Sequence, residues 1–239
     1  MRKFAAIAAI AAIVLSIGLV AAGQFHYAFY YDLSGGQDLE VNLINTMPWP
    51  ATLGMAVHDA YGGEIWTTTA ELGGYEPGFV RLGDAIPSEV HHWGVVTVDS
   101  DTRLIIGLEY FRDGLLISVD TVYSEIPALD PDEPFWLGTY YTQVGDAETA
   151  YIVMNPWART AHCSVDVYDA DGDRLSTRDF VLGPYESEYV FLGDDVGSGG
   201  LIWGFLDVSM EDVSVIIALE YTGRGCSELE IDNVTEYYF

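Results

Sequence analysis

Two stretches of this 239-residue chain are nearly identical, and they lie 110 positions apart. Residues 72–84 are LGGYEPGFVRLGD, and residues 182–194 are LGPYESEYVFLGD. The same offset relates Tyr-Tyr, Asn, Asp-Ala-x-Gly and Trp-Gly motifs on either side, and with one inserted residue it relates LIIGLEY at 104–110 to VIIALEY at 215–221. Matches at one spacing over about a hundred residues indicate a duplicated unit. A unit of this length is a domain, because solenoid repeats usually have periods of about 20 to 50 residues.

Each copy consists of short apolar runs separated by turn residues. The runs DLEVNLIN, TLGMAVHDA and WGVVTVDS are rich in Val, Ile, Leu and Thr, and AYGGE, LGDAIP and RDG are typical of turns. No segment of helical length shows a sustained three-to-four residue apolar period with caps. The pattern therefore predicts an all-β chain with two tandem antiparallel β-sandwich domains, immunoglobulin-like in the broad sense, of seven to eight strands each.

We place the first domain at residues 24–126 and the second at residues 136–239, each enclosing its own core. Two packed sheets are needed in each domain, because one sheet of this composition would leave an apolar face in water. Residues 127–135 contain three prolines. Proline at that density cannot continue a sheet and favours a semi-rigid spacer, so we expect this segment to be the linker.

The repeated stretch also predicts a corner between the sheets. Tyr75 and Tyr185 follow Gly-rich turns, and each is followed by a glutamate, Glu76 or Glu186. By analogy with the tyrosine corner of β-sandwiches, we expect each tyrosine to brace its two sheets through a hydrogen bond.

Taken together, the Tyr-Tyr, Asn, Asp-Ala-x-Gly, Leu-Gly-x-Tyr-Glu, Trp-Gly and Leu-Glu-Tyr motifs of both copies resemble those of tandem β-sandwich modules in uncharacterised secreted bacterial and archaeal proteins. The resemblance covers nearly all of the chain after its N-terminal segment. Its motifs belong to turns and strands. It therefore implies the fold and export from the cell, and it transfers no catalytic residue.

The chain opens with two basic residues followed by an apolar run, MRKFAAIAAIAAIVLSIGLVAAGQ. This layout is typical of a secretory signal peptide, and the Ala-Ala-Gly exit favours cleavage. The run is also close to the length needed to span a bilayer. We therefore interpret residues 1–23 as a signal peptide or membrane anchor, which predicts a secreted or cell-surface protein.

The charge is strongly acidic. The chain carries nine basic and 37 acidic residues, a formal net charge of −28, and Lys3 is its only lysine. A surface of this sign repels nucleic acids and anionic membranes, so we exclude both as partners, except for membrane attachment through an uncleaved N-terminal segment. An acidic surface that lacks lysine is also typical of salty surroundings, where screening reduces self-repulsion.

The only cysteines are Cys163 and Cys226, both in the second copy. In an oxidising compartment an even count within one domain indicates a disulfide, and the alternative is two unpaired buried thiols. We expect the disulfide.

The sharpest local candidate for a metal site is DADGD in the second copy. Asp169, Asp171 and Asp173 stand at alternate positions and offer oxygen ligands of the kind Ca²⁺ prefers. The glycine is at the fourth position, however, and position twelve of an EF-hand loop would be Phe180, which cannot ligate calcium. The alternative is a hairpin turn, in which Asp and Gly serve for their conformations. We expect no cofactor other than this possible Ca²⁺.

Pro-Trp pairs stand in the corresponding loop of both copies, at Pro48-Trp49 and Pro156-Trp157. Loop tryptophans can stack on sugars or anchor a partner protein, and they can equally cap the open end of a sandwich core. Trp49 and Trp157 are our candidates for a binding surface.

Nothing in the sequence indicates an enzyme. Glu109 and Glu220 recur in equivalent strands, and their presence in both copies favours a shared structural contact over acid–base catalysis. No nucleophile-elbow signature is present.

We therefore expect a non-catalytic structural or adhesive protein that acts through surface recognition or self-assembly, with other copies or cell-surface components as partners. The main alternative is a carbohydrate-binding module that uses the loop tryptophans on a polysaccharide. Lower alternatives are a secreted hydrolase and, from the aromatic terminus TEYYF, an outer-membrane β-barrel.

Overall fold

The computed structural model describes residues 25–87, 92–122, 126, 136–144, 147–197, 201–223, 230–234 and 237–238. The predicted signal segment and linker lie outside these residues. The strands and the helix of the first half are β1 (Phe25–Asp32), β2 (Gln37–Asn45), β3 (Ala51–Asp59), β4 (Glu64–Leu72), β5 (Pro77–Arg81), α1 (Leu82–Ala85), β6 (Trp93–Ser100), β7 (Leu104–Arg112) and β8 (Leu115–Val122). Those of the second half are β9 (Trp136–Val144), β10 (Ala147–Met154), β11 (Ala161–Asp169), β12 (Arg174–Leu182), β13 (Ser187–Phe191), α2 (Gly193–Val196), β14 (Leu201–Met210), β15 (Ile216–Gly223), β16 (Glu230–Val234) and β17 (Tyr237–Tyr238).

The all-β prediction is confirmed for the described residues, where both helices have only four residues. Within that part of the chain, no helix has the length and apolar character needed to cross a membrane.

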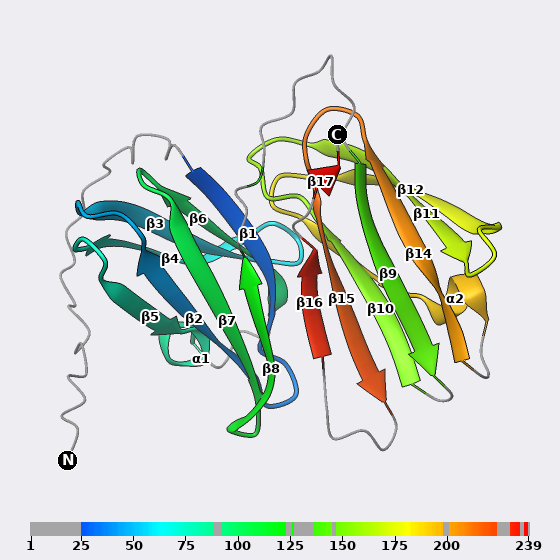
Figure 1. Cartoon of the computed structure of the whole chain (residues 1–239), viewed down its shortest axis with the longest axis horizontal. Coiled ribbons are helices and arrows are strands. Elements are labelled where there is room, and N and C mark those ends of the chain that lie inside the picture. The colour runs from blue at the N-terminus through cyan, green and yellow to red at the C-terminus, as the bar shows by residue number, and fades with distance from the viewer. Residues whose placement is uncertain are drawn as a thin grey trace.

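The strands form four antiparallel sheets, which we number I to IV. Sheet I has the order β5-β2-β7-β8, sheet II β1-β6-β3-β4, sheet III β13-β10-β15-β16 and sheet IV β12-β11-β14-β9-β17. Sheet III repeats the order of sheet I, and sheet IV repeats that of sheet II, with each strand number raised by eight and β17 added at one edge. The duplication seen in the sequence is therefore a duplication of strand order, and the two halves lie side by side (Figure 1).

Each half has a cluster of buried apolar side chains that comes from both of its sheets. In the second half, Tyr151, Val153, Ile217 and Leu219 of sheet III share a cluster with residues of sheet IV, which include Tyr141, Val165, Val167, Leu206 and Val208. These are alternate positions of their strands, as expected where one face of a strand points inward.

The cluster of the first half extends into the second. It contains Ile152, Met154, Ile216 and Ala218, which lie on the face of sheet III that points away from the second cluster. We expected each half to enclose its own core, and the first cluster instead crosses the boundary between the halves.

Strand β1 shows the cause, because it is buried on both faces. Every residue from Tyr27 to Tyr31 is fully buried. Tyr27, Phe29 and Tyr31 face the first-half core, while Ala28 and Tyr30 face sheet III. The sheets thus follow one another in the order I, II, III, IV, and the contact between sheets II and III is the seam of the molecule.

The repeated Asn and Glu motifs make the same backbone contacts in both halves. Asn45 Nδ2 donates to a carbonyl oxygen of the loop after β2 at 2.7 Å and to the carbonyl oxygen of Gly73 at 2.9 Å. Glu76 Oε2 accepts a hydrogen bond from the Gly73 amide at 2.6 Å. Asn155 and Glu186 repeat these three bonds. Together they tie the end of β2 or β10 to the turn that leads from one sheet to the other.

The tyrosine-corner prediction is wrong, because the brace comes from Asn and Glu. Tyr75 and Tyr185 have positive φ angles of 61° and 59°. This conformation turns both side chains away from their own cores. Tyr75 is 67% exposed, and the ring of Tyr185 stacks on His58 of the other half at 3.9 Å.

The Tyr-Tyr and Trp-Gly motifs meet at a β-bulge. The Tyr31 hydroxyl donates to the His58 carbonyl oxygen at 3.1 Å, where the register of β3 shifts. A Cβ on Gly94 would collide with that same carbonyl, so the neighbouring strand requires glycine. Tyr141 and Gly204 make the corresponding approach in the second half.

These contacts predict that Asn45→Ala destabilises the protein by about 2 to 3 kcal/mol, because the fully buried amide satisfies several backbone carbonyls. Chemical denaturation measures the change. Asn42→Ala, in the same strand, is the matched control. Its half-exposed side chain makes one hydrogen bond of 3.4 Å, and the expected change is within about 0.5 kcal/mol. Equal effects of the two substitutions would contradict the brace.

Candidate functional site

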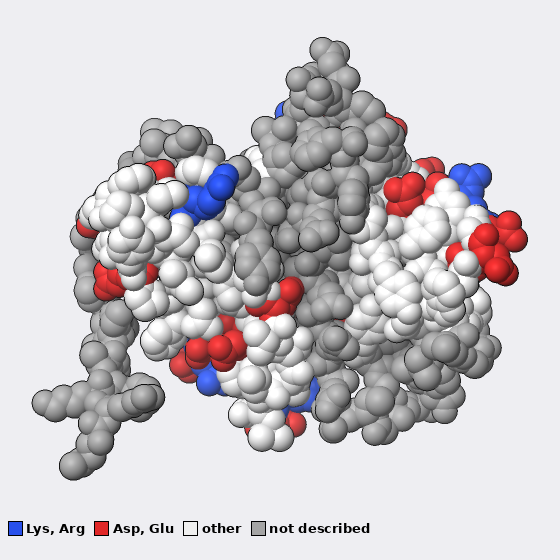
Figure 2. All heavy atoms as spheres, in the orientation of Figure 1, with Lys and Arg blue, Asp and Glu red and all other residues white. Residues whose placement is uncertain are grey.

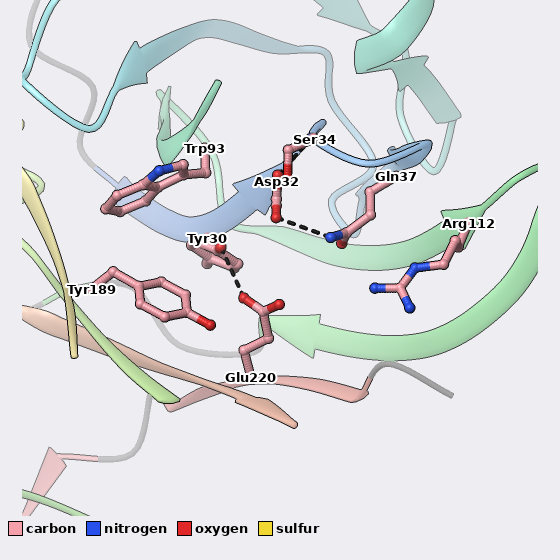
Figure 3. Close-up of a pocket in the computed structure, with 8 residues that line it drawn as sticks. All are labelled: Tyr30, Asp32, Ser34, Gln37, Trp93, Arg112, Tyr189 and Glu220. Atoms are coloured by element: carbon pink, nitrogen blue, oxygen red, sulfur yellow. Dashed lines mark hydrogen bonds between the residues drawn. The ribbon is translucent and has the colours of Figure 1, made fainter. Parts of the chain in front are cut away.

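A pocket of about 490 Å³ opens at the seam between the halves (Figure 3). The first half contributes residues from β1, the β1–β2 turn, the start of β2, β6 and the end of β7, and the second half contributes one residue each from β13 and β15. The lining residues are Tyr30, Asp32, Ser34, Gln37, Trp93, Arg112, Tyr189 and Glu220.

Strand alternation places these side chains together. Tyr30 and Asp32 are on the face of β1 that looks away from the first-half core, and Asp32 is directly opposite Trp93 across the β1–β6 pair. Tyr189 and Glu220 project from the facing surface of sheet III. The pocket therefore exists only because sheets II and III face each other.

Glu220 is the carboxyl of the pocket whose pKa is shifted. It is 5% exposed, and its Oε2 accepts a hydrogen bond from the Tyr30 hydroxyl at 3.1 Å. Burial raises the pKa of Glu220 to about 7, and the negative charge of Asp32 acts in the same direction. The hydrogen bond from Tyr30 and the positive charge of Arg112 oppose the rise only partly.

Asp32 is held by local hydrogen bonds. Its Oδ1 accepts from the Ser34 amide at 2.6 Å, and its Oδ2 accepts from Gln37 Nε2 at 3.0 Å. This pattern is an Asx-type turn at the β1–β2 connection. The carboxylate thus has a structural role and also keeps a negative charge near Glu220.

The arrangement offers an aromatic wall and a set of hydrogen-bonding groups. Trp93 and Tyr189 meet edge to face with ring centroids 5.8 Å apart, and Gln37 and Arg112 supply donors on the other side (Figure 3). Such a combination can accommodate a small polar ring. Chemically, a carboxyl with a pKa near 7 can exchange a proton at neutral pH.

The structure separates the two predicted Pro-Trp pairs. The Trp157 indole N–H donates to the Ser214 carbonyl oxygen at 2.8 Å, its ring stacks on His26 at 4.5 Å, and the Pro156 carbonyl oxygen lies 3.1 Å from His26 Nε2. This loop is part of the seam. Pro48 and Trp49 lie on the surface, with Trp49 55% exposed.

The two tryptophans are also not equivalent in position. The Trp157 carbonyl oxygen accepts the Tyr185 amide, and in the first half the Met47 carbonyl oxygen accepts the Tyr75 amide. Trp157 therefore corresponds to Met47. A binding role for Trp49 stays a prediction.

The DADGD segment forms the hairpin turn between β11 and β12. Asp169 Oδ1 accepts hydrogen bonds from the backbone amides of Asp171 and Asp173 at 3.0 and 2.9 Å. Asp59 makes the same two contacts in the first half, without the other carboxylates. Within the described ranges, no group of three or more acidic, His or Cys side chains is arranged to hold a metal ion. The turn accounts for the Asp and Gly spacing that both halves share, and calorimetric titration with Ca²⁺ remains the direct test of binding.

Cys163 is buried in β11, and burial raises the pKa of its thiol to about 12. Cys226 lies outside the described residues. The Cys163–Cys226 disulfide therefore stays a prediction.

The repeated strand glutamates have different environments. Glu220 is buried at the seam, whereas Glu109 is half-exposed on the outward face of sheet I, where Asn42 Nδ2 donates to it at 3.4 Å. The expectation of one shared structural contact was wrong. The sequence did contain a signal for the seam, because FHYAFYY and WGVVTV are apolar at both alternations, as in strands buried on two faces.

No family model and no curated protein matches this chain. Similar solved structures include a putative β-galactosidase from Bacteroides fragilis, β-glucuronidase 2 of Bacteroides uniformis and a glycosyl hydrolase family 2 member from Bacteroides cellulosilyticus. Their identities to this chain are 12%, 12% and 10%, and their TM-scores are 0.21, 0.19 and 0.19. Each match covers 89% of this chain and 32%, 26% and 27% of the other chain, so this chain spans about a third or less of their length. TM-scores this low support no argument about activity.

The raised pKa of Glu220 predicts a pH dependence of stability. Between about pH 4.5 and pH 7 the folded protein keeps the Glu220 proton, whereas the unfolded chain has lost it. The contribution of Glu220 to the free energy of unfolding therefore falls as the pH rises through this window, by up to about 3 kcal/mol, and is constant above it.

Glu220→Gln removes this dependence and retains an oxygen that can accept the Tyr30 hydrogen bond. The variant should gain stability relative to wild type as the pH rises from 4.5 to 7, in denaturation curves measured at several pH values. Glu109→Gln, at the half-exposed equivalent position, is the control for removing a carboxylate from the same motif. A flat difference for Glu220→Gln would contradict the buried titration.

Proposed function

We propose that this is a non-catalytic, exported structural or adhesive protein that acts at the cell surface or outside the cell. In this proposal residues 24–126 and 136–239 are two immunoglobulin-like β-sandwich domains joined by the linker at 127–135. The repeated strand order supports this, as do the two apolar clusters to which both sheets of each half contribute.

The observation that carries the proposal is the gathering of exposed apolar side chains on the two outermost sheet faces. Phe79 on sheet I is 62% exposed, and Tyr140 and Trp203 on sheet IV are 56% and 46% exposed. Contiguous apolar patches on a protein surface mark sites of interaction with other molecules. Such faces suit a protein that works by surface contact.

The polar groups of the pocket have structural partners, which supports a non-catalytic role. Glu220 receives a hydrogen bond across the seam from Tyr30, and Asp32 accepts bonds that close a turn. The Glu220 contact links the two halves, and the Asp32 contacts stabilise a turn within the first half.

The surface charge supports the choice of partners. Acidic side chains occur on both halves of the face shown in Figure 2, and few basic ones accompany them. The partners in this proposal are other copies of the chain or cell-surface components, and nucleic acids are excluded by repulsion.

A second candidate is saccharide binding, now in the seam pocket as well as at Trp49. Trp93 and Tyr189 form an aromatic wall beside the donors and acceptors of Gln37, Arg112 and Asp32. Aromatic surfaces combined with a few placed polar groups are typical of small-ligand sites.

Export predicts the fate of the protein in a secreting host. We expect recovery from the envelope or medium, with a mass that lacks about the first 23 residues and with the Cys163–Cys226 bridge formed. Intact-mass measurement with and without reductant reads both features. Full-length protein confined to the cytosol would contradict export.

The non-catalytic role predicts no turnover of chromogenic glycosides and no binding on a glycan array. If a saccharide does bind, two variants tell the sites apart. Loss of binding in the Gln37→Ala variant assigns the saccharide to the pocket, and loss of binding in the Trp49→Ala variant assigns it to the surface loop. Either result replaces the structural proposal with the second candidate.

A further inference from the structure

The seam between sheets II and III is built from a few specific contacts. Trp93 meets Tyr189 edge to face at 5.8 Å, and His58 stacks on Tyr185 at 3.9 Å. Tyr30 donates its hydroxyl hydrogen bond to Glu220 at 3.1 Å. One partner of each pair belongs to the first half and the other to the second.

The duplication gives the strand residues of the seam counterparts on the outermost faces. Sheet IV corresponds to sheet II, and the strand registers equate Tyr140 with Tyr30, Phe205 with Val95 and Trp203 with Trp93. In the seam, Tyr30 and Val95 are fully buried. On sheet IV, Tyr140, Phe205 and Trp203 are 56%, 42% and 46% exposed.

The other side of the seam has its counterparts on sheet I. The registers equate Ile44 with Met154, Phe79 with Tyr189 and Ile105 with Ile216. Met154 and Ile216 are buried, whereas Ile44, Phe79 and Ile105 are 40%, 62% and 36% exposed. Tyr75, the counterpart of Tyr185, is 67% exposed. Seven of the fifteen large apolar side chains that are exposed in the described part of the chain therefore occupy positions that a second seam would bury.

We propose that sheet IV of one copy docks on sheet I of the next copy, in the arrangement that sheet II adopts on sheet III within the chain. This inference specifies the self-assembly named in the proposed function and rests on it. The pairs across the new contact are Trp203 with Phe79, Tyr168 with Tyr75 and Tyr140 with Glu109, and each corresponds to a pair in the seam.

The aromatic residues of sheet IV are already arranged for such a contact. Tyr168 and Phe205 are stacked at 4.5 Å with an interplanar angle of 5°, and Tyr140 and Trp203 lie 6.1 Å apart. Rings held by their neighbours lose little conformational freedom on docking.

At several positions the docking faces differ from the seam in ways that should make the contact between copies weaker. Asp166 and Asp207 of sheet IV stand where sheet II has Ala56 and Thr97. In the seam, the Ser187 amide donates a hydrogen bond to the Ala60 carbonyl oxygen. The residue of sheet I that corresponds to Ser187 is Pro77, which has no amide hydrogen and cannot make this bond. We therefore expect reversible association.

Charge adds a dependence on salt. The copies are both strongly acidic, and the two docking faces carry Glu109 on sheet I and the Asp166–Asp207 pair on sheet IV. Exposed charges interact over about 10 Å at 0.1 M salt and about 3 Å at 1 M. Association should strengthen as the salt concentration rises.

The contact joins two different faces, and each copy carries one of each. Such a heterologous interface does not close in a dimer, so it continues into a filament or a ring. The expected species therefore grow with protein concentration.

The test is sedimentation velocity of the protein as a secreting host processes it, over a range of concentrations at 0.1 M and 1 M NaCl. Wild type should form species larger than dimers, and more of them at 1 M. Phe79→Asp blocks sheet I, and Trp203→Asp blocks sheet IV. Each variant alone should be monomeric. A one-to-one mixture should form dimers and nothing larger, because only one intact pair of faces remains.

Tyr61→Asp is the matched control. It also replaces an exposed aromatic side chain, 88% accessible, with a carboxylate, but it lies in the turn after β3, which belongs to neither sheet I nor sheet IV. It should assemble as wild type does. Dimer formation in the mixture also shows that both blocking variants are folded.

Wild type that stays monomeric at 1 M NaCl would overturn the inference, as would assembly of either single variant like wild type. A monomer that is exported and adheres to cells would keep the proposed function and remove only the docking of copies. A monomer that binds or cleaves saccharides would remove both.

Discussion

The face-to-face contact of sheets II and III is the interaction on which the rest of the structure depends. It buries the outward face of β1 and β6, where a single half would expose Tyr30 and Val95 to water. It also removes water from Glu220, which is why this carboxyl holds its proton to higher pH than an exposed glutamate. The pocket is a consequence of the same contact, since residues of both halves line it.

Much of the fold could be predicted from the repeat, because several repeated residues act on the backbone of their own half. Asn45, Glu76 and Gly94 each contact a main-chain group within one half, and so do their counterparts. Such a contact needs only the local strand arrangement. A repeated residue of this kind therefore means a repeated structure, and the strand order of the two halves agrees accordingly.

The seam could not be predicted in the same way, because it depends on which faces meet. Glu109 and Glu220 stand in the same motif, yet one is half-exposed and the other buried. Trp157 contacts His26 of the other half, while the matching position in the first half is Met47. Spacing along the chain gives no information on contacts between halves. The one indication in the sequence is that β1 and β6 are apolar at successive positions, and not only at every second one, as in strands that are buried on both faces.

Strand β17 lies along the outer edge of β9, and Pro77 begins the edge strand β5. An added strand and a proline both discourage backbone pairing between molecules at a sheet edge. If copies assemble through their sheet faces, all backbone hydrogen bonds between strands remain within single molecules. The sheet-to-sheet spacing of about 10 Å would then run roughly along the axis of an assembled fibre, and the strand spacing of about 4.8 Å across it, which is the reverse of the order found in amyloid.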